Sequence, residues 1–352
     1  MLIANVCSNE KPKNISDVKN VWNEKPKYST EQEFIKLKKL HSIDLDEYED
    51  YYITNFTSMD VDSDDNLYVP DYLSATITVF DKNGKYLRTM GQHGQGPGDL
   101  EFPYSISILR DTLYIYENRK GIKVWDRNGK YIDFFVKKRG NYHAIKALKD
   151  FFLSIQYRVA IGDKGEHISF HLERFNSEFE FLNEIAMINR IQDDFNFGID
   201  NFVAVDSKKN VYFPEKEDEY IIGKYDLDGN KLLAFGREYK RKPYSDRVIE
   251  RNINKFRKYK TNPHPKYPPV VRFIIIDDRD YVWVVVGEWG YDCGGEFTVT
   301  STIDIFDSEG NFLYNFQSTY FNFPSFIKNG RLYSAPYYDD NNIHVFEIEY
   351  KK

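Results

Sequence analysis

Short runs of alternating apolar and polar residues, separated by polar turns, repeat along most of this chain. Six times an aromatic residue ends a strand-like run, and in five cases a polar turn and a second apolar run follow at once. These residues recur at intervals of 40 to 50 residues, apart from one interval of 81, and this spacing is typical of four-stranded propeller blades. The six aromatic residues are Phe80, Trp125, Phe175, Tyr225, Phe306 and Phe346.

Each repeat predicts two hairpins. The Asn-Gly or Asp-Gly steps at 83–84, 128–129 and 228–229 supply the positive φ of a tight turn between two outer strands. A second hairpin pattern precedes each of them, as at 59–69. Two hairpins make one four-stranded antiparallel blade, and such blades must stack because none can bury its faces alone. The sequence therefore predicts an all-β fold, a six-bladed β-propeller.

The two ends of the repeat array predict how the ring closes. The last repeat stops after its third strand, near Tyr350, which leaves an exposed sheet edge. The segment from Ile35 to Leu45 is strand-like and has no hairpin partner of its own. We expect it to be the outer strand of blade six, so that an N-terminal strand completes the C-terminal blade. Residues 1–34 are then predicted to be a flexible leader, and residues 35–352 one propeller domain.

The composition of the chain excludes some classes of binding partner but says little about an activity. The net charge of −7 does not favour nucleic acid or an anionic membrane as a partner. No run approaches the roughly 18 apolar residues of a membrane span, so we expect no transmembrane segment. Because closed propellers hide their sheet edges, we expect a monomer.

The first residues suggest a location. Cys7 follows a short apolar segment, an arrangement similar to the end of a lipoprotein signal, and a leader without lipid is the alternative. Cys7 and Cys293 lie outside any metal-ligand spacing, and no disulfide between them is expected. We expect a periplasmic or extracellular protein, with a lipid anchor through Cys7 as the open question.

Two segments carry candidate chemistry of their own. The glycine-rich stretch 91–98 lacks the Gly-Lys-Ser/Thr ending of a phosphate-binding loop, so a tight connection between blades is favoured, with His93 at the binding face. The insertion at about 237–270 is basic on an acidic protein. It is either a solvated cap or a docking surface for an anionic partner.

The loops between the second and third strands of the blades place aromatic residues beside carboxylates and amides. Such groups suit a glycan or peptide, because rings stack on apolar faces while polar groups fix orientation. The predicted ligand-binding residues are His93, Tyr72, Arg119, Arg272, Trp289 and Tyr338. The alternative is a divalent cation such as calcium held by Asp71, Glu117, Glu288 and Asp339.

Several motifs resemble the bacterial six-bladed β-propeller family related to NHL repeats. They are the linker Gly91–Gly98 with the residues that follow it to Tyr104, Val21-Trp22, Tyr267–Arg272 leading to Asp277 and Val282–Val284, and the aromatic-Asp-x-x-Gly turns. The resemblance runs from about Ile35 to Tyr350 and is poorest in the third repeat, whose outer turn lacks glycine. The resemblance implies a family in which many members are secreted or periplasmic lipoproteins. Relatives of that family include binding modules and metal-dependent lyases or lactonases.

The leading hypothesis is a non-enzymatic module that binds a protein, peptide or glycan at the loop face, without a cofactor. The alternative is a metal-dependent hydrolase or lyase, in which an ion at the central channel polarises a carbonyl or activates water. No catalytic motif is legible in linear order. That silence does not exclude an enzyme, because a propeller assembles its sites from different blades.

Overall fold

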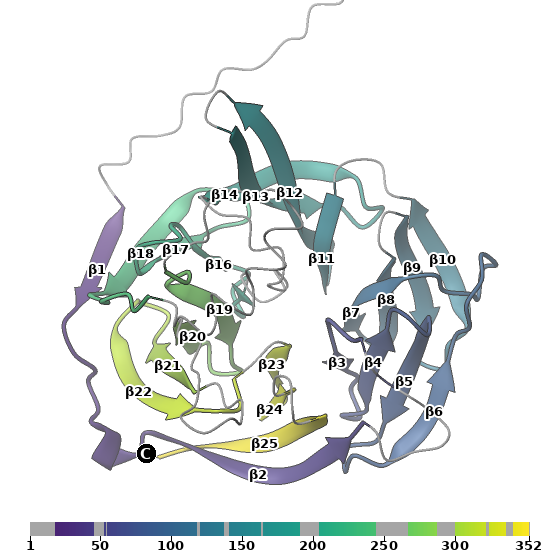
Figure 1. The fold of residues 1–352 in the computed structure, drawn as a ribbon, viewed down its shortest axis with the longest axis horizontal. Coiled ribbons are helices and arrows are strands. Elements are labelled where there is room, and N and C mark those ends of the chain that lie inside the picture. Colours follow the sequence, from purple (N-terminus) through teal and green to yellow (C-terminus); the bar gives the residue numbers. More distant parts are fainter. Residues whose placement is uncertain are drawn as a thin grey trace, which may run out of the picture.

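Six β-sheets surround a central axis (Figure 1), which confirms the predicted six-bladed propeller and its N-terminal closing strand. The strands follow the predicted runs. Successive side chains of a strand point to opposite faces of its sheet, and the two faces pack against the two neighbouring blades. This computed structural model describes residues 18–45, 53, 55–117, 120–136, 141–162, 165–190, 204–243, 267–286, 300–321, 324–335 and 341–351.

The first three blades are four-stranded antiparallel sheets in chain order. Blade one contains β3 (Asp60–Val61), β4 (Leu67–Asp71), β5 (Thr76–Phe80) and β6 (Tyr86–Met90). Blade two contains β7 (Pro103–Leu109), β8 (Thr112–Glu117), β9 (Gly121–Asp126) and β10 (Tyr131–Val136). Blade three contains β11 (Asn141–Leu148), β12 (Phe151–Gly162), β13 (Gly165–Phe175) and β14 (Phe181–Arg190).

The other three blades include two N-terminal strands. Blade four contains β15 (Ala204–Val205), β16 (Val211–Pro214), β17 (Ile221–Tyr225), β18 (Lys231–Arg237) and the added β1 (Lys19–Asn23). Blade five contains β19 (Val271–Ile276), β20 (Val282–Val286), β21 (Ser301–Phe306) and β22 (Phe312–Ser318). Blade six contains β23 (Ser325–Lys328), β24 (Arg331–Ser334), β25 (Asn342–Tyr350) and β2 (Ile35–Asp44), and a 3₁₀ turn, η2 (Thr30–Gln32), precedes β2.

Two features stabilise the outer turn of each complete repeat: a polar side chain at its start that accepts backbone hydrogen bonds, and a later residue with a positive φ. In blade one, the Asp81 carboxylate accepts hydrogen bonds from the backbone N–H groups of Asn83 and Lys85, both at 2.9 Å. Gly84 takes a φ of 84°, which strains any residue with a Cβ. In blade three, Phe179 adopts the same left-handed region at φ 59°, so this repeat keeps the turn without glycine.

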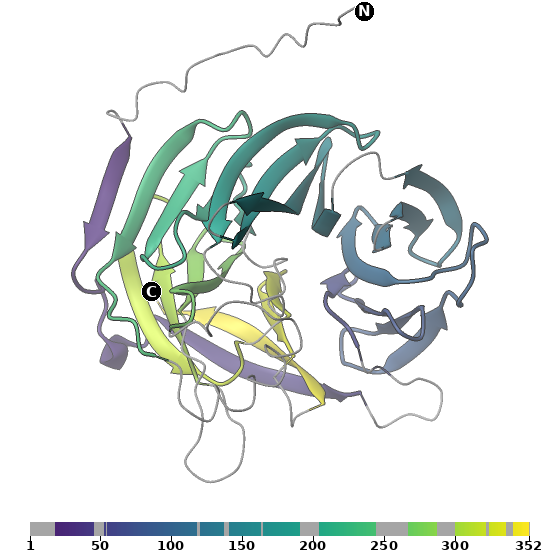
Figure 2. The same ribbon diagram turned by 45° about the horizontal axis from the view of Figure 1, so that its top comes forward.

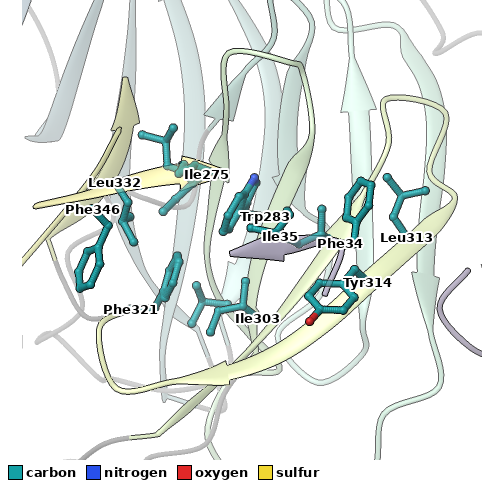
Figure 3. Packing of buried hydrophobic residues seen from close by; sticks show 14 of the residues in the cluster. Phe34, Ile35, Ile275, Trp283, Ile303, Leu313, Tyr314, Phe321, Leu332 and Phe346 are labelled. Carbon is teal, nitrogen blue, oxygen red and sulfur yellow. The ribbon is translucent and has the colours of Figure 1, made fainter. Parts of the chain in front are cut away.

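Six hydrophobic clusters fill the interfaces between neighbouring blades and carry the packing around the ring. The cluster between blades five and six is shown in Figure 3, where Trp283 and Phe321 stack with ring centroids 5.8 Å apart. The cluster between blades six and one joins Ile43 and Val345 to Val61. Because blade six contacts both neighbours, the ring is closed.

The closing strand lies where the alternation predicts it. β2 pairs antiparallel with β25, from Ile35 opposite Tyr350 to Asp44 opposite Asn342. Blade six is therefore completed by a strand from the other end of the chain (Figures 1 and 2).

The predicted flexible leader is wrong for residues 18–34. β1 adds to β18 as a parallel fifth strand of blade four. The Asn23 amide donates to the carbonyls of Gly236 and Gly310 at 3.1 and 2.9 Å, and Phe34 stacks on Tyr28 at 4.6 Å. These contacts hold the segment on the outside of blades four to six, and residues 1–17 lie outside the described part.

Candidate functional site

A cavity of about 500 Å³ lies on the axis of the ring. Its walls come mainly from the first strand of every blade and the turn that follows it. In all six blades this strand is the innermost of the sheet (Figure 1). Polar residues of these strands, such as Ser107 and Lys146, line the cavity together with aliphatic neighbours such as Ile106.

Asp60 in β3 is fully engaged by the protein. Its carboxylate accepts hydrogen bonds from the backbone of Val61 at 2.8 Å and of Ile108 at 2.6 Å. The Lys328 ammonium in β23 lies 2.9 Å from the same carboxylate and also donates to the Val61 carbonyl at 2.7 Å. This pair joins blades six, one and two at the cavity wall.

The other acidic residues of the wall are also held in place. Asp206 and Asp277 each begin the turn after a first strand and accept hydrogen bonds from that turn's backbone and from a buried aromatic side chain. Those aromatic partners are Tyr212 at 3.2 Å and Trp283 at 2.7 Å. Asp280 accepts hydrogen bonds from Ser207, and Asp278 accepts one from the backbone of Gly330.

Lys146 in β11 is the exception. Its ammonium faces the cavity and has no hydrogen-bond or ion-pair partner among the residues that the structure describes. The Lys146 side chain is exposed to solvent within the cavity, yet desolvation by the surrounding protein lowers the pKa of its ammonium. The negative charge of Asp60 opposes this lowering, and the like charge of Lys328 adds to it. Lys146 is thus a cavity-lining cation without a partner in the described part of the chain.

We expect Lys146→Met to change how stability depends on pH. Because burial lowers the pKa of Lys146 in the folded protein, the unfolded chain holds this proton to a higher pH, and stability rises with pH between the two values. Measured from neutral pH upward, the wild type should therefore gain stability relative to the variant as the pH rises toward about 10, the ordinary lysine value. Urea unfolding of both proteins across this range measures the difference, and a constant difference would contradict the assignment.

The cavity lies at the end of the ring opposite the predicted loop face. The first and second strands of a blade are antiparallel, so the turn joining them and the loop after the second strand lie at opposite ends. The cavity wall includes residues of the first turns, such as Ser207 and Asp280. The sequence of β11 could have indicated Lys146 as a site residue, because this charged residue lies between the apolar Ile145 and Ala147.

At the predicted loop face, Asp71 and Tyr72 have local partners. The Asp71 carboxylate accepts hydrogen bonds from the backbone of Leu73, Ser74 and Asn55 at 2.8 to 3.1 Å. The Tyr72 hydroxyl donates to the Asn55 side chain at 3.3 Å. These hydrogen bonds hold the loop after β4 in place, so both side chains stabilise a turn in this structure.

Glu117 and His93 lie near the glycine-rich stretch. The buried Glu117 carboxylate lies 3.2 Å from the Lys123 ammonium, which donates to the carbonyl of Gly96 in that stretch and to the carbonyl of Asp99 directly after it. The Asp99 carboxylate accepts a hydrogen bond from the Gly96 backbone at 2.8 Å. His93 is exposed and forms a bridge with Leu100. The stretch is thus a folded connection between blades, as favoured from the sequence.

Arg272 lies in β19, half-buried, and donates to the Ser301 hydroxyl at 2.9 Å. The remaining predicted site residues, Arg119, Trp289, Tyr338, Glu288 and Asp339, lie outside the described residues. Within the described ranges, no three His, Cys, Asp or Glu side chains converge on a point that could hold a metal ion.

Two arginines of the basic insertion are structural. Arg241 donates to the carbonyls of Tyr267 and Pro268, which closes the base of the insertion. Arg237 pairs with the buried Asp304 at 2.7 Å. Residues 244–266 of the insertion lie outside the described ranges, so the choice between a cap and a docking surface stays a prediction.

None of the helices in the described ranges has the length and apolar character needed to cross a bilayer.

Comparisons with known proteins agree with this architecture. The sequence model of the family described as 6-bladed beta-propeller (DUF5128) matches residues 9–226. Among solved structures, a DUF4221 family member from Bacteroides vulgatus has a TM-score of 0.53 at 12% identity, over 91% of this chain and 100% of its own. A putative exported protein from Bacteroides fragilis has a TM-score of 0.49 at 10% identity, over 95% of this chain and 99% of its own.

A streptogramin B lyase has a TM-score of 0.48 at 10% identity, over 90% of this chain and 98% of its own. At 12% identity, the likeness to the DUF4221 family member shows the fold alone. A search of curated proteins finds no significant match.

Proposed function

Since this chain belongs to the 6-bladed beta-propeller family (DUF5128), we propose that it is a binding module whose ligand occupies the axial cavity. The family agrees with the resemblance to bacterial six-bladed propellers, whereas the relation to NHL repeats stays a prediction. A volume of about 500 Å³ lies within the usual range of roughly 300 to 1,000 Å³ for small-ligand sites.

The observation that carries the proposal is the unengaged Lys146 ammonium beside carboxylates that are all held by other groups. A cation with no partner favours a ligand that brings a negative charge, because a charge-assisted hydrogen bond is about twice as strong as a neutral one. The Ser105 and Ser107 side chains of β7 line the same cavity. The ligand class is therefore an acidic glycan or a peptide carboxylate.

The test compares Lys146→Met with the control Lys149→Met in thermal unfolding against acidic and neutral forms of the same sugars and dipeptides. Lys149 is exposed in the turn after β11. A ligand at a hundred times its Kd should stabilise the wild type and the control by about 2.7 kcal/mol. Lys146→Met should lose this stabilisation. Equal stabilisation of both variants, or by neutral and acidic forms alike, would refute the role of Lys146.

The alternative of a metal-dependent hydrolase or lyase stays a prediction. No observation on the described residues favours it over a binding module with its ligand in the axial cavity. It is tested by metal content and by unfolding with a chelator, which should lower the Tm only if an ion is bound. The periplasmic or extracellular location and the lipid at Cys7 also stay proposals, since Cys7 lies outside the described residues.

A further inference from the structure

Blade three carries an extension that closing the ring does not require. β12 has 12 residues, whereas the second strands of the other blades have four to six. All these strands start from the first turn of their blade, so the far half of the β12–β13 hairpin reaches beyond its neighbours. Figure 1 shows this hairpin projecting past the outline of the ring.

Three polar side chains are linked on one face of this extension. Ser169 and His171 are alternate residues of β13, so their side chains share a face. The Ser169 hydroxyl lies 2.7 Å from His171 Nε2, and the Glu184 carboxylate of β14 lies 2.8 Å from His171 Nδ1. The three groups form a continuous chain from a hydroxyl to a carboxylate.

The partners determine the proton positions in the neutral imidazole. A carboxylate can only accept, so His171 Nδ1 carries the hydrogen and donates it to Glu184. Nε2 is then the acceptor, and the Ser169 hydroxyl donates to it. This is the order of roles in a serine nucleophile, its general base and an orienting carboxylate, which is recognised by geometry on unrelated folds.

We propose that Ser169, His171 and Glu184 form a nucleophilic relay whose substrate class is an activated carboxylic ester. The site is separate from the axial cavity and does not depend on the proposed ligand there. Ser169 is the catalytic nucleophile, His171 the general base, and Glu184 a positioning residue.

The surroundings suit these roles. His171 is 6% exposed and Ser169 is half-buried, so the base is shielded while the hydroxyl is reachable. The Arg158 guanidinium lies 3.6 Å from the Glu184 carboxylate and helps to hold that side chain in place. Gln156 is directly opposite His171 across the β12–β13 ladder, and its buried Nε2 has no hydrogen-bond partner in the described part of the chain. It is a donor on the same face that can serve an oxyanion.

The reaction balances with the substrate and water alone. Ser169 Oγ attacks the acyl carbon, and its proton passes to His171 Nε2. The ester C–O bond then breaks, the alkoxide takes the proton from the imidazolium, and the alcohol leaves an acyl ester on Ser169. Water repeats the sequence on that ester, which releases the carboxylic acid and restores the serine.

The test treats the full chain with a fluorophosphonate, which phosphonylates an activated serine with loss of fluoride, and maps the adduct by mass spectrometry. We expect one adduct, on Ser169, that is absent in Ser169→Ala. Ser42→Ala is the matched control, because Ser42 also pairs with a histidine, His344 Nδ1, at 2.8 Å. It should label like the wild type.

Two further variants separate a relay from a purely structural network. His171→Gln should lower the labelling rate on the order of 10²–10⁴-fold, and Glu184→Gln should lower it while thermal unfolding shows that both are folded. An adduct that persists in Ser169→Ala, no adduct on the folded wild type, or rates unchanged in folded His171→Gln would each overturn the proposal.

Discussion

Removing residues 1–45 is expected to prevent the propeller from folding. The deletion takes away β2 and the buried side chains of Ile35, Ile43 and Leu45. Each is worth about 2–5 kcal/mol, so their combined loss is comparable with the whole stability of about 5–15 kcal/mol of a typical domain. It also exposes the edge of β25, which invites association. Size-exclusion chromatography and urea unfolding measure the result.

Two controls make this result specific to ring closure. Of the described elements, removing residues 1–24 takes away only β1, which lies on the outside of blade four with Trp22 59% exposed. This deletion should leave a cooperative transition. A circular permutant in which β2 follows β25 through a short turn should restore the fold. The two ends are close enough to join, because the Lys351 backbone donates to the Phe34 carbonyl at 3.1 Å. An unchanged urea midpoint after removing residues 1–45 would show that β2 does not hold the ring closed.

Asp304→Ala is expected to destabilise the fold by about 3–5 kcal/mol, because it leaves a largely buried charge without its partner. Asp304 in β21 is fully buried and accepts hydrogen bonds from Arg237 Nε and the Tyr220 hydroxyl, both at 2.7 Å. Burial raises the pKa of this carboxyl, and Arg237 and Tyr220 partly offset that rise. The Arg237 guanidinium also lies 5.2 Å from the Tyr220 ring centroid. Urea unfolding near neutral pH measures the loss.

The double variant Arg237→Met, Asp304→Ala should recover much of that loss, because replacing both members of a buried pair with apolar groups is often nearly neutral. The matched control is the pair of the half-buried Arg174 and the exposed Asp228, which lie 3.4 Å apart. Asp228→Ala should change stability by no more than about 1 kcal/mol. A double variant as unstable as Asp304→Ala alone would show that the loss does not come from an unpaired buried charge.

Local patterns determined most of the fold. The turns follow from Asp81 and Gly84 and their equivalents, whose hydrogen bonds span four residues. The closing strand was legible because the last repeat lacks an outer strand and Ile35–Leu45 lacks a partner. The same reasoning failed for residues 18–34, since a polar segment can gain order from a sheet edge far away in sequence, as β1 does on β18.

The tertiary structure decided the sites. Alternation places Lys146 on one face of β11, but only the stacking of six blades makes that face the wall of a cavity. Ser169 and His171 are two residues apart in the sequence, whereas Glu184 reaches the His171 imidazole only through the pairing of β13 with β14. The sequence by itself determined strands, turns and ring closure because these depend on a period of two and on neighbouring residues. Convergence of side chains depends on strand register and blade packing, which no local pattern encodes.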